Sequence, residues 1–120
     1  MIIYISRTGN VEYIVNKLNL PSVNMKDVSN VSNPYFIFTY TDGLGEVPLE
    51  VSRFLNSNHK YCKGVIASGN RNFGTNNFCG CADTISKKYS IPVIHKIDLR
   101  GFESDYEIVK DKYKEHLGGK

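Results

Sequence analysis

Residues 1–11 read MIIYISRTGNV, and this short stretch decides the fold. The apolar run from Ile2 to Ile5 is typical of a buried strand, and it ends at the hydroxyl residues Ser6 and Thr8. A helical pattern begins directly after Gly9, because four apolar residues share one helix face: Val11, Ile14, Val15 and Leu18. The stretch therefore predicts a strand, a tight turn and a helix N-terminus in direct succession.

A junction of this kind suits a phosphate group. It directs backbone N–H groups and the positive end of a helix dipole toward one point. Ser6, Thr8 and Asn10 can add side-chain hydrogen bonds, whereas Arg7 is expected to be an exposed helper. An ordinary turn carries the same residue types for local reasons. The phosphate interpretation therefore depends on support from other loops of the chain.

The rest of the chain repeats the alternation of strands and helices. Apolar or aromatic runs predict further strands at residues 22–26, 35–40, 64–68 and 91–97. Amphipathic stretches predict helices after Pro48, around Phe78 and at a capping box formed by residues 104–107. Strands that alternate with helices form a parallel sheet covered on both faces. We therefore expect residues 1–120 to form a single α/β domain.

Composition narrows the classes of function. The chain has 120 residues and a net charge of +3, but its basic residues form no stripe, so a nucleic-acid partner is not expected. No stretch approaches the ~20 apolar residues of a membrane span, and the N-terminus lacks the pattern of a signal peptide. The odd number of cysteines, three, favours reduced thiols in the cytoplasm. Cys79 and Cys81 have no matching His/Cys pair, so no metal site is expected.

Three loops that follow predicted strands share an unusual composition. Residues 6–10, 41–48 and 68–76 are rich in glycine, asparagine, serine or threonine. In an open parallel sheet, ligands bind beyond the carboxyl ends of the strands, where the strand order reverses. The other two strand ends, at Asp27 and Asp98, lead into ordinary polar connections. We therefore expect these three loops to build one ligand site.

The loops favour a mononucleotide with a flat aromatic head. The first loop lacks the lysine of a P-loop, and no Gly-x-Gly-x-x-Gly motif follows the first strand. Tyr40, Leu44 and Phe73 offer apolar or aromatic faces to a ring. The predicted cofactor-binding residues are Ser6, Arg7, Thr8, Gly9, Asn10, Val11, Tyr40, Thr41, Asp42, Gly43, Leu44, Gly45, Ser68, Gly69, Asn70, Asn72, Phe73 and Gly74.

Three motifs carry a resemblance to a known family: SRTGNV at 6–11, TYTDGLGEVP at 39–48 and ASGNRNFG at 67–74. The chain resembles flavodoxins in layout and, more closely, the NrdI proteins, which are flavodoxin-like partners of class Ib ribonucleotide reductase. The third motif is the most specific, because ordinary flavodoxins carry an acidic, differently spaced loop there. The resemblance implies a flavodoxin-like three-layer α/β sandwich, a five-stranded parallel sheet of order 2-1-3-4-5, and FMN as cofactor.

The resemblance also implies a function. Reduced flavin would reduce dioxygen, and the resulting superoxide or peroxide would serve assembly of the dimanganese–tyrosyl radical centre. The implied partners are the small subunit of class Ib ribonucleotide reductase, dioxygen, and a separate reductase as electron donor. The protein would then be a redox activator rather than a stand-alone enzyme. Family members often carry Trp at the position of Phe73 and Phe at that of Leu44, so ring contacts are reduced here.

Two alternatives stay open at the level of sequence. A general single-electron flavodoxin would share the fold, and a cofactor-free interaction module would share both the fold and the loops. The motif at 67–74 and the net charge of +3 favour the NrdI-type function over the first alternative. Excess negative charge near the ring opposes an anionic reduced flavin, so a positive chain suits a two-electron reductant. Binding of FMN separates both flavoproteins from the second alternative.

Overall fold

The computed structural model describes residues 1–74 and 77–118. Within them, five parallel strands form one sheet of order β2-β1-β3-β4-β5. The strands are β1 (Ile2–Tyr4), β2 (Ser22–Asn24), β3 (Tyr35–Tyr40), β4 (Cys62–Gly69) and β5 (Val93–Asp98). The α-helices are α1 (Asn10–Leu18), α2 (Leu49–Asn58), α3 (Gly80–Tyr89) and α4 (Glu103–Leu117). Short 3₁₀ turns occupy Met25–Asp27 (η1), His59–Tyr61 (η2) and Arg71–Phe73 (η3). The predicted strand order and element order are confirmed.

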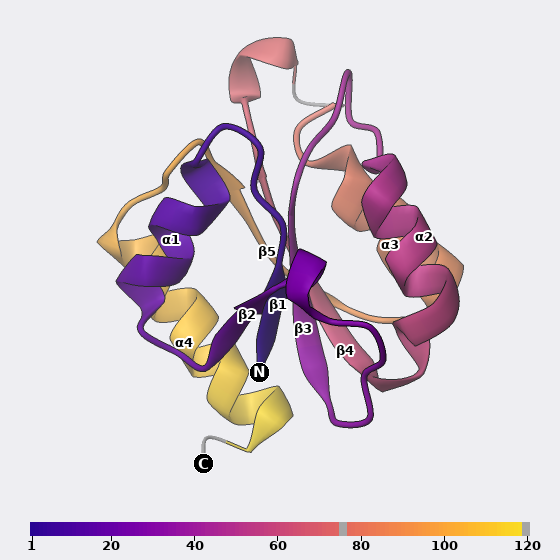
Figure 1. Ribbon diagram of the computed structural model, residues 1–120. Coiled ribbons are helices and arrows are strands. Elements are labelled where there is room, and N and C mark those ends of the chain that lie inside the picture. Colours follow the sequence, from indigo (N-terminus) through magenta and orange to yellow (C-terminus); the bar gives the residue numbers. More distant parts are fainter. Residues whose placement is uncertain (75–76, 119–120) are drawn as a thin grey trace.

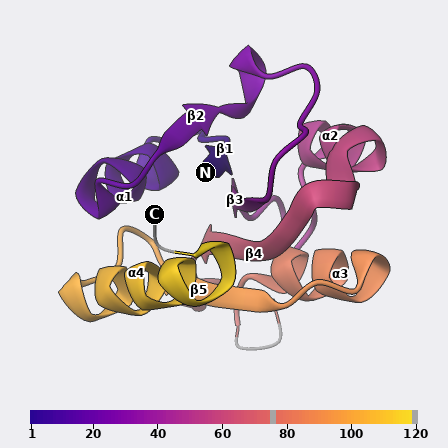
Figure 2. The ribbon, with the colours of Figure 1, turned by 90° about the horizontal axis from the view of Figure 1, so that it is seen from below.

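The sheet lies between two helical layers. Helices α1 and α4 cover one face, and α2 and α3 cover the other (Figure 2). Successive side chains of a strand point to opposite faces, so β3 supplies both hydrophobic cores. Tyr35 and Ile37 belong to the core under α2 and α3, whereas Phe36 and Phe38 belong to the core under α1 and α4. All four are fully buried, which explains why this strand is apolar without alternation.

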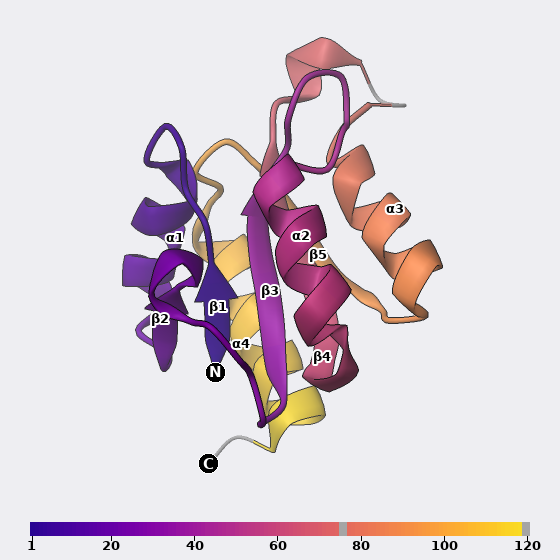
Figure 3. The ribbon, with the colours of Figure 1, turned by 45° about the vertical axis from the view of Figure 1, so that its right-hand side comes forward.

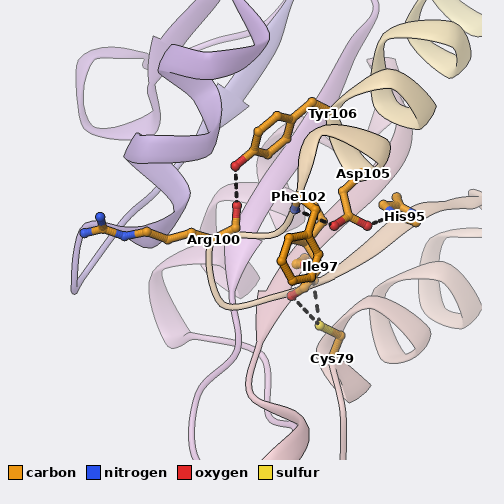
Figure 4. A network of polar contacts seen from close by, with 8 residues as sticks. Cys79, His95, Ile97, Arg100, Phe102, Asp105 and Tyr106 are labelled. Atoms are coloured by element: carbon orange, nitrogen blue, oxygen red, sulfur yellow. Dashed lines mark hydrogen bonds and ion pairs between the residues drawn. The ribbon is translucent and has the colours of Figure 1, made fainter.

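Two helix starts differ from the sequence prediction. Helix α4 begins at Glu103 rather than within a capping box at 104–107. Asp105 Oδ2 accepts the N–H of Phe102 at 2.8 Å, and its Oδ1 lies 2.7 Å from His95 Nε2 on β5 (Figure 4). The contact with β5 holds the carboxylate where it caps the earlier residue. Helix α3 begins at Gly80, so Phe78 packs into the core from the preceding turn.

The loops that follow β1, β3, β4 and β5 all lie at the same edge of the sheet, at the top of Figure 1. The loop 41–48 lies beside the segment that contains η3 in both Figure 1 and Figure 3. Among the described residues, no helix combines the length and apolar character needed to cross a membrane.

Candidate functional site

A cavity of about 230 Å³ opens at this carboxyl edge. Eleven of the predicted site residues line it: Ser6, Arg7, Thr8, Asn10, Val11, Tyr40, Thr41, Gly43, Ser68, Gly69 and Asn70. The three predicted loops meet there because β1, β3 and β4 are neighbours in the sheet. Asn77 and Leu99 also line the cavity, and the sequence prediction did not include them.

The N-terminus of α1 forms one end of the cavity. Gly9 precedes the helix with φ +96°, and no heavy atom lies within 4 Å of the position that a Cβ would take there. Ser6 Oγ accepts the N–H of Glu12 at 3.3 Å, and Gly9 O accepts that of Tyr13 at 2.9 Å. Within residues 1–74 and 77–118, no hydrogen bond engages the N–H groups of Asn10 or Val11. This end therefore combines open space, two backbone donors and a helix dipole, which together suit an anion.

Arg7 connects the first loop to the second across the mouth of the cavity. Its guanidinium lies 4.5 Å from the centroid of the Tyr40 ring and donates a hydrogen bond of 3.0 Å to Asp42 Oδ1. This bond lowers the pKa of Asp42 and raises that of Arg7. Both side chains are about half exposed, so solvent screens the pair and limits its contribution to stability. The pairing leaves Arg7 charged but places a carboxylate beside its guanidinium.

The loop 41–48 is a tight hairpin. Asp42 N–H donates to Glu46 O at 2.9 Å, and Glu46 N–H donates to Asp42 O at 2.7 Å. Gly45 has φ +97°, a conformation that favours glycine. Thr41 Oγ1 joins the hairpin to the end of β4 by donating to Ser68 O at 2.9 Å. Leu44 lies at the tip, is 64% exposed and does not line the cavity.

The third loop leaves β4 and turns through η3. Asn70 Oδ1 accepts the N–H of Asn72 at 2.9 Å, and the Arg71 guanidinium lies 4.2 Å from the centroid of the Phe78 ring. The side chain of Phe73 and residues 75–76 lie outside the part of the chain that the structure describes. The ring contact of Phe73 therefore stays a prediction. The other predicted residues belong to these loops but not to the cavity lining: Gly9, Asp42, Leu44, Gly45, Asn72 and Gly74.

The connection after β5 forms a fourth wall, so the expectation of an ordinary polar connection at Asp98 was wrong. Ser68 Oγ donates to Leu99 O at 2.6 Å, and Leu99 N–H donates to Gly69 O at 2.7 Å. Asp98 Oδ1 accepts the N–H of Arg71 at 3.1 Å. Leu99 adopts a left-handed φ of +55°, which is uncommon for a leucine. The signal for this wall was the strand order, because β5 lies next to β4.

Cys79 lies under the floor of the cavity. It is fully buried, and its thiol donates weakly to Ala67 O at 3.5 Å and Ile97 O at 3.9 Å (Figure 4). Burial raises the pKa of the Cys79 thiol to about 12, with a smaller contribution from Cys81. A protonated thiol is a poor nucleophile, so Cys79 acts as a packing residue here.

The architecture is similar to that of a solved flavodoxin. A short-chain flavodoxin associated with a non-canonical PDU bacterial microcompartment superposes with a TM-score of 0.63 at 23% sequence identity. The match covers 98% of this chain and 94% of that one. Together with the cavity at the carboxyl edge, this likeness defines a protein of the flavodoxin-like fold.

A family model narrows the class. The model described as "NrdI Flavodoxin like" matches residues 2–111, which include all four loops around the cavity. The chain belongs to the NrdI flavodoxin-like family.

Proposed function

We propose that the protein binds FMN in the cavity at the carboxyl edge and acts as the redox activator of a class Ib ribonucleotide reductase. The observation that carries this proposal is the convergence of the three glycine-containing loops on one cavity, in a chain of the NrdI flavodoxin-like family. Family membership implies a flavin, and the cavity supplies an anion-binding end and an aromatic wall.

The residues around the cavity fit the parts of FMN. The phosphate would lie at the N-terminus of α1, where the hydroxyls of Ser6 and Thr8 and the amides of Asn10 and Val11 are available as donors. Tyr40 would contact the ring. The cavity volume of about 230 Å³ is below the ~300 Å³ at which ligand pockets usually begin. A bound FMN would therefore extend past the cavity to the rim formed by the loops 41–48 and 70–74.

When bound and reduced, FMN supplies the electrons that convert dioxygen to superoxide or peroxide. The oxidant serves assembly of the dimanganese–tyrosyl radical centre in the small subunit of the ribonucleotide reductase. A separate electron-donor protein reduces the flavin. The chain itself has a binding and positioning role. The helix α1 end would hold the phosphate, and the walls at Thr41, Ser68 and Leu99, which are joined by hydrogen bonds, would orient the flavin.

The first experiment measures binding and then activation. Apoprotein is titrated with FMN, and the reduced holoprotein is mixed with the small subunit, Mn(II) and dioxygen. We expect saturable binding and a tyrosyl radical signal in electron paramagnetic resonance. A signal no larger than that of a sample without the flavoprotein contradicts the activator function, and failure to bind FMN contradicts the flavoprotein.

Two threonine variants locate the site. Thr8→Ala removes a hydroxyl at the proposed phosphate end and should raise the Kd for FMN by about 10- to 100-fold, since a hydrogen bond to a charged group contributes about 1.5–3 kcal/mol. Thr84→Ala is the matched control, because Thr84 is an exposed residue of α3 that donates to Gly80 O at 3.2 Å and does not line the cavity. Equal Kd values for Thr8→Ala and the wild type would place the phosphate elsewhere.

A further inference from the structure

Arg100 reaches from the connection after β5 to the N-terminal turns of α1. Its Nε donates to Asn10 Oδ1 at 3.1 Å, across 90 residues of sequence. Its guanidinium lies 4.6 Å from the centroid of the Tyr13 ring. Figure 4 shows the side chain extended away from its own loop. A cation from a distant part of the chain therefore lies beside the helix end at which the phosphate is proposed.

Arg100 has no carboxylate partner among the described residues. None of the ion pairs between described residues includes Arg100, whereas Arg7 pairs with Asp42 at 3.0 Å. Among residues 1–74 and 77–118, no acceptor takes a hydrogen bond from the two terminal nitrogens of Arg100. Arg71 lies on the third loop, over Phe78. Arg100 is thus the arginine that offers both charge and donors at the α1 end.

The backbone that carries Arg100 is well anchored. Arg100 O accepts the hydroxyl of Tyr106 at 2.6 Å (Figure 4), and Gly101 N–H donates to Asp98 O at 2.9 Å. Asp105 holds the next amide, that of Phe102, at 2.8 Å. The ring of Tyr13 and the side-chain oxygen of Asn10 then restrict the side chain of Arg100. A guanidinium held in this way loses little freedom on binding a ligand.

We propose that Arg100 supplies the cation of the phosphate site, so that the phosphate monoester of the flavin lies between the N-terminus of α1 and the Arg100 guanidinium. The inference rests on the proposed function. It accounts for an anion site whose own loop, 6–11, contains no lysine and whose arginine is paired with Asp42. Guanidinium groups match phosphate oxygens in geometry and remain charged at every physiological pH.

The test compares two flavins that differ by the phosphate. FMN carries it and riboflavin does not, and their Kd values are measured for wild type, Arg100→Gln, Arg100→Lys and Lys114→Gln. Lys114→Gln is the matched control, since it removes one positive charge from the last turn of α4, an exposed position far from the cavity. We expect Arg100→Gln to raise the Kd for FMN about tenfold and to leave that for riboflavin unchanged. Arg100→Lys should retain most of the preference for FMN, and Lys114→Gln all of it.

Each other outcome overturns the inference. Equal weakening of both flavins by Arg100→Gln would mean that Arg100 only packs the loop against α1, and a wild-type ratio would mean that it does not contact the phosphate. Thermal unfolding of Arg100→Gln checks that the fold is intact. If the wild-type protein binds no FMN, the proposed function fails together with the inference. If it binds FMN and the ratio of the two Kd values does not respond to Arg100→Gln, the inference alone fails.

Discussion

Gly69→Ala tests how tightly the floor of the cavity is packed. Gly69 ends β4, lines the cavity, and has no positive φ, so an alanine is conformationally allowed. An added Cβ would lie 2.9 Å from Cys79 Sγ, 3.2 Å from Thr41 Oγ1 and 3.3 Å from Cys79 N. The thiol is fully buried, and Thr41 Oγ1 is bonded to Ser68 O. None of the three atoms is the free end of a flexible side chain.

We expect Gly69→Ala to lower the free energy of unfolding by about 1–3 kcal/mol, the usual cost of an extra methyl group in a packed interior. The backbone nitrogen of Cys79 has no rotamer to adopt, so the turn before α3 must shift. The same shift changes the cavity wall, so the Kd for FMN should also rise. Urea denaturation gives the change in stability from the midpoint at constant slope, and a flavin titration gives the change in Kd.

Cys79→Ala provides the second half of a double-mutant cycle. It deletes the closest atom to the new methyl group, at an individual cost of about 1 kcal/mol for lost packing. In the Gly69→Ala/Cys79→Ala protein, the added methyl fills the vacated space. The double variant should therefore be about 1 kcal/mol more stable than the sum of the two single costs predicts. Additive costs would refute the claim that the thiol limits the space at Gly69.

Three further predictions concern the wall after β5 and the buried thiol. Gly101→Ala should cost about 2–4 kcal/mol in thermal unfolding, because its Cβ would lie 2.5 Å from Ile97 Cγ2 at φ +69°. Gly118→Ala, at φ +85° with no atom within 4 Å, should cost only the conformational ~1–2 kcal/mol, and equal losses would refute the clash. Asp105→Ala removes the carboxylate that caps α4 and should cost about 1–2 kcal/mol in urea, together with weaker FMN binding; unchanged stability would contradict the capping role. Burial raises the pKa of Cys79 to about 12, against about 8.5 when unfolded, so the folded state binds more protons and stability should fall as the pH rises from about 8.5 toward 12. Cys79→Ala should reduce that fall, and an unchanged pH dependence would show that this thiol does not contribute.

The sequence predicts those parts of the fold that depend on residues close together in the chain. The strand 35–40 has apolar residues on both of its faces from Tyr35 to Phe38, because α2 and α3 cover one face and α1 and α4 the other. The loops 6–10 and 41–48 are recognisable because tight turns need glycine, as the φ values of Gly9, Gly43 and Gly45 show. Each of these signals is complete within a dozen residues. Helix starts were less predictable, since the cap of α4 depends on His95 from the neighbouring strand.

The wall after β5 has no local signature, because Leu99 and Arg100 acquire their place only from the order of the strands. β5 lies next to β4, and this pairing brings Leu99 within 2.7 Å of Gly69 O, while Arg100 crosses to α1. The positions of the arginines near the α1 end also depend on the order of the strands. Arg7, within the proposed phosphate loop, pairs with Asp42, whereas Arg100 reaches Asn10 from 90 residues away and has no carboxylate partner among the described residues. The topology of the sheet therefore brings to the α1 end a second arginine that proximity in sequence does not reveal.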